Sequence, residues 1–305
     1  MSQNIPTWYV QQYSTNIELL LQQKTSRLNN TVRRGSHVGK QASPVDQVGA
    51  IAAQKVTTRF GPMGRVDAPL DRRWVFPVDY DLPQLIDHFD KLRLLTDPNS
   101  SFAQNSMAAM NRAMDDEIIG AYFGTAKTGE QGGTSTTWAT TLTTSGGQNV
   151  SVNTGGTASN LNSSKIREGK KTLMAAEVDL DTDMIFMPVT ASQHDALLNE
   201  ITIISSDFNG GERPVLQEGK VTRWLGVNIP HTERLTTGTA DDSSTSRQVP
   251  MYSQSGMYLG DWDGTIHDLT QRKDLQGLPY QIYDCMTFGA TRLEERKMVR
   301  IWCKE

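Results

Sequence analysis

The sequence predicts an α+β fold in which one long helix and a segment of mixed helices and strands form the body of the chain. Three observations support this prediction. The apolar residues of Gln104–Gly124 recur every three or four positions, as on one face of a helix. Residues 45–80 have the pattern of a hairpin around a Gly-Pro-Met-Gly turn. Residues 165–198 show a helix, a strand and a helix in order, which is typical of a mixed α/β sheet.

The composition indicates a globular chain with a sizeable core. It has 305 residues, of which 37% are hydrophobic and 21% charged, with a formal net charge of −4. This balance does not favour strong nucleic-acid binding by the whole chain. Cys285 and Cys303 are too few for a disulfide framework, so a reduced cytosolic setting is expected. The N-terminus lacks the pattern of a signal peptide, and no apolar run is long enough to cross a membrane.

Residues 1–40 are predicted to form an arm. No acidic residue occurs between Glu18 and Asp46, and the charge of that stretch is entirely basic. This pattern favours a subunit contact or a solvated tail, while contact with nucleic acid remains an alternative. The basic residues are Lys24, Arg27, Arg33, Arg34 and Lys40.

The hairpin is predicted to need a covering partner. Its second arm alternates the apolar Trp74, Phe76 and Val78 with Arg73, Val75 and Pro77, as in a half-exposed strand. An isolated two-stranded hairpin is marginally stable in water. If the hairpin projects from the body, a neighbouring subunit is the expected cover; an ordinary hairpin within one sheet is the alternative.

A long helix is predicted from Pro98 to Phe123. Asp97 suits the N-cap, Pro98 suits the first helical position, and Gly124 suits the stop. At about 1.5 Å per residue this helix is roughly 39 Å long. A short amphipathic helix is predicted before it, over Leu82–Leu95.

Three consecutive acids, Asp115, Asp116 and Glu117, interrupt the apolar stripe of this helix. Successive helical residues point about 100° apart, so these carboxylates do not converge on one metal ion. We expect them to face solvent or a basic surface of a neighbouring subunit. The residues predicted to contact another subunit are Arg72, Arg73, Trp74, Asp115, Asp116 and Glu117.

The second half of the chain is predicted to build a mixed domain. Gln131–Ser164 carries no charge and suits either short strands and turns or a disordered linker. A helix over Lys165–Ala176 and a strand ending at Pro188 follow, and then a helix capped by Thr190. A further strand unit leads to a polar loop at 236–246, which is expected to be an exposed tip. From about Pro250 onward, strands with tight turns are expected.

Catalytic and metal-binding motifs are lacking. No Gly-Lys pair has the spacing of a phosphate-binding loop, and none of the five histidines shares a helix with another at ligand spacing. Gly260–Gly264 resembles the start of a calcium loop, but Arg272 stands where the twelfth-position acid is required. We therefore predict no catalytic residue, no metal site and no cofactor. A carboxylate-dependent enzyme using Asp115, Asp116 or Asp261 is a weaker alternative.

Four local phrases, taken in order, resemble the major capsid proteins of tailed bacteriophages, which share the Hong Kong phage coat fold. They are Met184–Ile201, Trp224–Leu235, Met257–Leu269 and Ala290–Trp302. The resemblance implies an N-terminal arm, an extended hairpin loop, a peripheral domain with a long spine helix, and a mixed α/β axial domain. The implied boundaries are 1–40 for the arm, 41–80 for the hairpin loop, 81–124 for the peripheral domain, 125–250 for the axial domain, and 251–305 for the return strands.

The resemblance also implies a function. Such a chain is expected to assemble through pentamers and hexamers into an icosahedral shell around double-stranded DNA. Portal and scaffolding proteins are the implied partners, with cement proteins as a further option and weak contact with DNA. The implied place is the virion capsid after synthesis in the host cytoplasm, with no membrane contact. An encapsulin-like compartment shell and a host-binding tail protein remain as alternatives.

Overall fold

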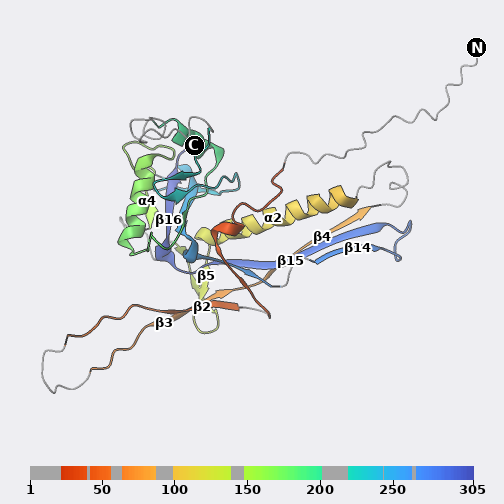
Figure 1. Ribbon diagram of the computed structural model, residues 1–305, viewed down its shortest axis with the longest axis horizontal. Coiled ribbons are helices and arrows are strands. Elements are labelled where there is room, and N and C mark those ends of the chain that lie inside the picture. Colours follow the sequence, from red (N-terminus) through yellow and green to blue (C-terminus); the bar gives the residue numbers. More distant parts are fainter. Residues whose placement is uncertain are drawn as a thin grey trace, which may run out of the picture. The chain divides into compact units, whose positions relative to one another are not determined.

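The computed structural model describes residues 22–39, 42–55, 64–86, 99–138, 148–200, 219–242, 244–262 and 266–305. These residues fall into two compact units (Figure 1). Unit 1 draws on Met1–Ser26, Asp79–Ala113 and Gly264–Met286; unit 2 draws on Arg27–Val78, Met114–Asp263 and Thr287–Glu305. This division differs from the five predicted segments, whose boundaries stay predictions. No described helix is long and apolar enough to span a membrane.

The predicted long helix is present as α2, Asn99–Phe123, drawn in yellow in Figure 1. Its end immediately before Gly124 agrees with the prediction, whereas the expected cap and first residue at 97–98 lie outside the described residues. The apolar stripe is largely buried, but Met107 is 38% exposed. The buried members are Ala108, Met110, Met114, Ile118, Ile119 and Tyr122. The helix is therefore a packed structural element.

The prediction of a helix over Leu82–Leu95 is wrong for its first five residues. They belong to strand β4, Val78–Ile86, in which more exposed and more buried residues alternate from Asp79 onward. Pairing with strand β15 imposes a two-residue period there, so tertiary contacts override the helical pattern. Residues 87–98, which include the rest of the predicted helix, lie outside the described part of the chain.

Unit 1 contains a long antiparallel hairpin. Strand β14, Ile266–Gln271, pairs with the first half of β15, Tyr280–Arg292, from Ile266 opposite Cys285 to Gln271 opposite Tyr280. Residues 22–24 lie along α2 in the same unit. The Gln22 side chain bonds to both Asn105 and Arg112, with distances of 3.0 and 2.7 Å.

The main sheet of unit 2 has seven strands, in the order β7-β16-β12-β8-β10-β9, with β11 beside β12. Helices α4 (Ser163–Ala175) and α5 (Ala191–Leu198) belong to the same unit. Gly169 of α4 lies against β12 and β16, where an added Cβ would be 3.1 Å from the Met251 sulfur. The strands are β7 (Asn149–Val150), β8 (Ile185–Phe186), β9 (Arg223–Trp224), β10 (Val227–Asn228), β11 (Thr237–Thr239), β12 (Thr245–Ser253) and β16 (Met298–Cys303).

Two further sets of strands lie in unit 2. Strand β1 (Arg33–Ser36) pairs in parallel with β13 (Met257–Asp261), which pairs with the second half of β15. The other set is a four-stranded sheet in the order β2-β3-β5-β6. Its strands are β2 (Ala42–Val48), β3 (Leu70–Val75), β5 (Ala126–Thr128) and β6 (Thr134–Thr136). Single turns of 3-10 helix are η1 (Asn29–Thr31), η2 (Gln254–Gly256) and η3 (Glu295–Lys297).

Most expectations for the second half of the chain are confirmed. Helix α4 covers the predicted range except Ala176, which is its C-cap, and Thr190 forms a capping box with Gln193 at the start of α5. Strands β6 and β7 confirm short strands within Gln131–Ser164, of which 139–147 lie outside the described residues. The prediction of an exposed loop at 236–246 is wrong in part, because β11 pairs there with β12.

The segment after residue 26 is fastened to the body by a buried carboxylate. Asp115 of α2 is fully buried, and its oxygens accept hydrogen bonds from the backbone N–H groups of Arg27 (3.0 Å) and Leu28 (3.2 Å). A chain of hydroxyls continues nearby from Thr31 to Tyr252 (2.6 Å) and from Tyr122 to Tyr252 (2.9 Å). The part of the predicted arm after residue 26 is therefore packed in unit 2.

Two titratable groups are buried side by side near the C-terminus. Lys165 is fully buried and donates to the carbonyls of Ser159 (2.6 Å) and Trp302 (2.8 Å). Burial lowers the pKa of Lys165, because an ammonium group loses its hydration there. Cys303 is the second of these groups, and burial raises the pKa of its thiol to about 12. Elsewhere in unit 2, burial likewise raises the pKa of the Tyr252 hydroxyl to about 12.

We expect Asp115→Ala to destabilise the subunit by about 3 kcal/mol, because two backbone donors would lose a charged acceptor. The matched control is Asp116→Ala, whose half-exposed ion pair with Arg234 should contribute about 1 kcal/mol or less. Urea unfolding of unassembled subunits measures both free energies. Equal losses in the two variants would contradict the buried role of Asp115.

Alkaline pH should destabilise the subunit. The folded-state pKa of Cys303 lies above its ordinary 9.0, so the unfolded chain releases the thiol proton first and stability falls as pH rises from 9 towards 12. The slope from this one group is about 1.4 kcal/mol per pH unit. Cys303→Ala should therefore lose less stability than the unsubstituted chain between pH 9 and 11. Thermal unfolding across that range checks this, and parallel curves would contradict it.

Candidate functional site

The residues predicted to contact another subunit lie at the base of the hairpin and on α2. At the hairpin base, Arg72 of β3 forms an ion pair with Asp46 of β2 at 2.5 Å, and its guanidinium lies 5.7 Å from the centre of the Trp74 ring. Both charged side chains are partly exposed, and the hydrogen bond to Asp46 raises the pKa of Arg72. This face of the hairpin base is therefore open to a partner.

Trp74 is held by the turn between β5 and β6. Its indole Nε1 donates to the carbonyl of Gly129 at 2.7 Å. Gly132 in the same turn has φ +72°, and an added Cβ would lie 3.1 Å from both the Trp74 and the Phe76 rings. A glycine is required there for its backbone conformation as well as for space.

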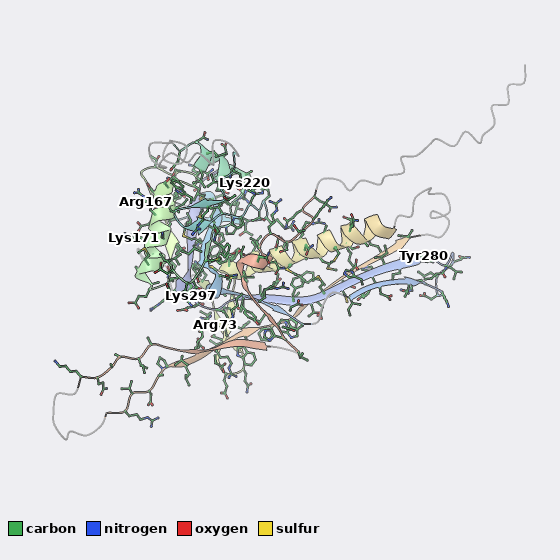
Figure 2. The ribbon with its side chains drawn as sticks, viewed as in Figure 1. Arg73, Arg167, Lys171, Lys220, Tyr280 and Lys297 are labelled. Atoms are coloured by element: carbon green, nitrogen blue, oxygen red, sulfur yellow. The ribbon has the colours of Figure 1, made fainter. Side chains whose placement is uncertain are left out.

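The alternation along β3 is confirmed, but the buried face is not the aromatic one. Arg73 and Val75 are 6% and 1% exposed, whereas Phe76 is 40% exposed. The side chain of Arg73 is therefore buried in its own subunit (Figure 2), so its charge is not exposed for contact with a neighbour as expected.

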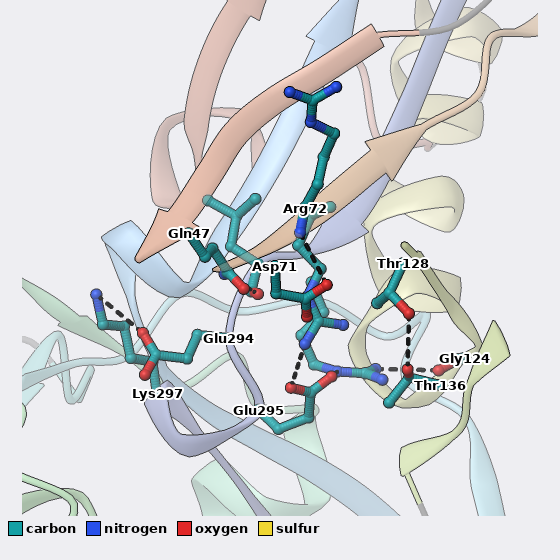
Figure 3. A network of polar contacts seen from close by, with 12 residues as sticks. Gln47, Asp71, Arg72, Gly124, Thr128, Thr136, Glu294, Glu295 and Lys297 are labelled. Atoms are coloured by element: carbon teal, nitrogen blue, oxygen red, sulfur yellow. Dashed lines mark hydrogen bonds and ion pairs between the residues drawn. The ribbon is translucent and has the colours of Figure 1, made fainter. Parts of the chain in front are cut away.

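Arg73 is buried because it belongs to an internal ion network. Its Nη2 bonds to Oε2 of Glu295 at 2.6 Å, and the other oxygen of Glu295 accepts from Nε of Arg292 at 3.4 Å. Figure 3 shows Arg72 pointing away from Glu295. Glu295 therefore links the hairpin base to the end of β15. We call Arg73, Arg292 and Glu295 the joint.

Arg292 extends the joint to the end of α2. Its Nη1 donates to the carbonyls of Tyr122 (2.8 Å), Gly124 (3.0 Å) and Ala121 (3.3 Å). A cation is favourable at this end, where carbonyls without helical partners carry partial negative charge. Burial lowers the pKa of Arg292, while Glu295 opposes that shift. The guanidinium also lies 5.3 Å from the centre of the Trp138 ring.

The three acids of α2 have different environments. Asp115 is buried in its own subunit, so the expectation that it faces solvent or a neighbour is wrong; its carboxylate instead binds the backbone at residues 27–28. Asp116 pairs with Arg234 and raises that arginine's pKa. Glu117 is half-buried and lines a cavity of about 140 Å³. Contact of Asp116 or Glu117 with another subunit stays a prediction.

The arms of the hairpin carry exposed apolar side chains that the sequence prediction did not single out. Val48 and Leu70, at the ends of the paired strands, are 68% and 78% exposed. Ile51 and Val66 lie further along the arms and are 61% and 45% exposed. Val66 lies between Arg65 and Asp67, which was an available signal, whereas Ile51 lies among alanines. The predicted turn at Gly61–Gly64 lies outside the described residues except for Gly64.

The carboxylates named by the enzyme alternative are engaged within the subunit. Asp115 binds backbone N–H groups, Asp116 pairs with Arg234, and Asp261 lies 3.5 Å from Arg34. Within the described residues, no group of three or more His, Cys, Asp or Glu side chains is arranged to hold a metal ion. A cavity of about 460 Å³ lies beside the hairpin base, lined by Gln47, Asp71, Leu293 and Lys297 among others.

Several capsid structures share this fold at low sequence identity. The chain matches the Cyanophage Pam1 capsid with a TM-score of 0.72 and 12% identity, covering 99% of this chain and 98% of that one. The capsid of Cyanophage P-SCSP1u gives a TM-score of 0.70 and 12% identity, covering 100% and 97%. The mature capsid of bacteriophage PhiM1 gives 0.67 and 11%, covering 95% and 90%. No curated protein matches the chain.

A family model described as phage capsid protein matches residues 5–305, almost the whole chain. This match agrees with the long helix, the hairpin and the mixed sheet described above, and it does not favour the compartment, tail-protein or enzyme alternatives. The chain belongs to the phage capsid protein family and is a major capsid protein of a phage.

Proposed function

We propose that the chain assembles through pentamers and hexamers into an icosahedral shell around the double-stranded DNA of a tailed phage. The observation that supports this most is the hairpin. Its base is anchored by buried and exposed ion pairs, whereas its arms expose Ile51 and Val66. Exposed apolar side chains on arms with little cover of their own are stabilised by burial against another copy.

Modest contacts suffice for such an assembly because each copy repeats them. A closed shell uses the same patches on every subunit, and several weak contacts acting together give high avidity. We propose that Arg72, Asp116 and Glu117 add polar contacts to another subunit and that the Trp74 ring adds an aromatic one. In contrast, Arg73 and Asp115 act inside their own subunit, because both are buried.

The remaining expectations belong to the same proposal. The chain acts as a structural protein in the virion capsid, is synthesised in the host cytoplasm, and needs portal and scaffolding proteins, with cement proteins as further partners. Its net charge of −4 suits weak contact with packaged DNA. Tight binding through many Lys and Arg contacts would instead strengthen with each neutralised phosphate and hinder packaging and release.

Electron microscopy and sedimentation of the purified chain, alone and with a scaffolding protein, test the proposal directly. Pentamers, hexamers or closed shells are expected. Protein that remains monomeric under all these conditions would overturn it.

Replacing residues 50–68 by a two-residue turn should leave a folded subunit that does not assemble. The shortened segment keeps the Arg72–Asp46 and Arg73–Glu295 pairs, so the base of the hairpin remains intact. Circular dichroism checks folding, and electron microscopy checks assembly. Normal shells from this variant would show that the arms are dispensable.

Asp116→Lys should reduce the yield of shells at least several-fold while lowering subunit stability by about 1 kcal/mol or less. The physical reason is that the half-exposed Asp116–Arg234 pair contributes little to folding but presents charge at the surface. Lys171→Glu on α4 is a control for charge reversal elsewhere on unit 2, since Lys171 is also exposed. Large destabilisation of the monomer by Asp116→Lys would place Asp116 in the folding core instead.

A further inference from the structure

The turn between β15 and β16 contacts both strands of the hairpin base. From β2, Gln47 donates its Nε2 to the carbonyl of Leu293 at 2.6 Å. From β3, Arg73 pairs with Glu295 at 2.6 Å. Gly289 of β15 also approaches the hairpin closely, since an added Cβ would lie 2.2 Å from the Phe76 carbonyl oxygen. The base is thus held at three points by one short stretch of chain.

The described residues of the arms beyond this base, 49–55 and 64–69, have few contacts that could set their direction. Residues 49–55 and 64–69 are assigned to no strand, and Gly49 donates to the Pro69 carbonyl at 2.7 Å where the arms begin. The side chains at 49–55 are mostly exposed. The direction in which the arms leave unit 2 must therefore be decided largely at the base.

Glu295 is the central residue of the joint because it pairs with two cations, Arg73 and Arg292. Arg73 Nη2 bonds to one oxygen of Glu295, and Arg292 Nε bonds to the other. Among the described atoms, Arg73 Nε and Nη1 are buried without a hydrogen-bond partner. Within the described part of the chain, the bond to Glu295 is thus the one that orients the buried guanidinium of Arg73.

A small rotation at the joint becomes a large displacement along the arm. From Val48 to Lys55 an extended chain spans about 23 Å, at about 3.3 Å per residue. A tilt of about 10° at the base would then move Lys55 by about 4 Å. Apolar side chains pack at separations of about 4 Å, so such a shift removes one set of contacts and creates another.

We propose that Glu295 is a positioning residue for assembly: through Arg73 and Arg292 it sets the angle at which the hairpin meets the next subunit. The inference rests on the proposed function, in which the hairpin covers a neighbouring copy. Arg292 of the joint also binds the carbonyls of Tyr122 and Gly124 at the end of α2. The angle of the hairpin and the end of the long helix are therefore set together.

The test measures the hairpin angle in unassembled subunits and, separately, the shells they form. Spin labels at Ala53→Cys on the arm and Lys171→Cys on α4 report one distance within unit 2, in a background with Cys285→Ser and Cys303→Ala. The variants are Glu295→Gln and Arg73→Gln. The second leaves Glu295 paired with Arg292, so it removes one cation from the joint and keeps the rest.

Two controls separate positioning from stability. Arg72→Gln removes the exposed ion pair on the same strand, and Val299→Ala weakens the buried pairing of β16 with β12 while leaving all three joint residues in place. We expect both joint variants to shift or broaden the label distance by about 4 Å, the displacement estimated above for a tilt of about 10°, and to yield shells of mixed size. Both controls should keep the original distance.

An unchanged label distance in folded Arg73→Gln subunits would overturn the proposal, even if their thermal stability fell. Shells of normal size from both joint variants would overturn it as well. A failure of the unsubstituted chain to form shells bears on the proposed function instead, because the label distance is measured before assembly.

Discussion

The carboxylate of Glu295, which is 12% exposed, balances two buried guanidinium groups, and the hairpin base, the end of α2 and the β15–β16 turn are arranged around that requirement. Charges are expensive to remove from water unless each meets a partner of opposite sign or several hydrogen bonds. Arg292 meets this demand with three carbonyls at the end of α2 and with Glu295. Arg73 meets it through Glu295. The hairpin, the helix end and the β15–β16 turn are thereby brought to one place.

The same logic governs the start of the described chain. Asp115 is a carboxylate in the middle of an apolar stripe, and its burial is stabilised because two backbone N–H groups from residues 27 and 28 meet it. The segment that follows forms β1 beside β13. A charge inside the subunit therefore holds the backbone at residues 27–28, while the charges outside, such as Arg72 and Asp116, remain accessible.

This separation of buried and exposed charges suits a protein of the capsid family. A subunit that repeats its contacts many times needs a stiff body, because small errors in angle add up around a closed shell. The buried pairs provide that stiffness, and the half-exposed pairs and apolar arm residues leave surface for neighbours. Thus Arg72 and Arg73, adjacent in sequence, act on opposite sides of β3.

Local patterns of amino acids were enough to predict the elements whose signals lie within a few residues. The end of α2 at Phe123, the range of α4 and the Thr190 cap follow from caps, glycines and apolar spacing, which depend on a few neighbouring residues. The sequence did not predict β4, because residues 82–86 have a helical pattern but pair with β15 as a strand. Nor could it determine that Asp115 and Arg73 are buried. Their partners lie 88 and 222 residues away in the chain, and only the tertiary structure brings a partner over such a separation.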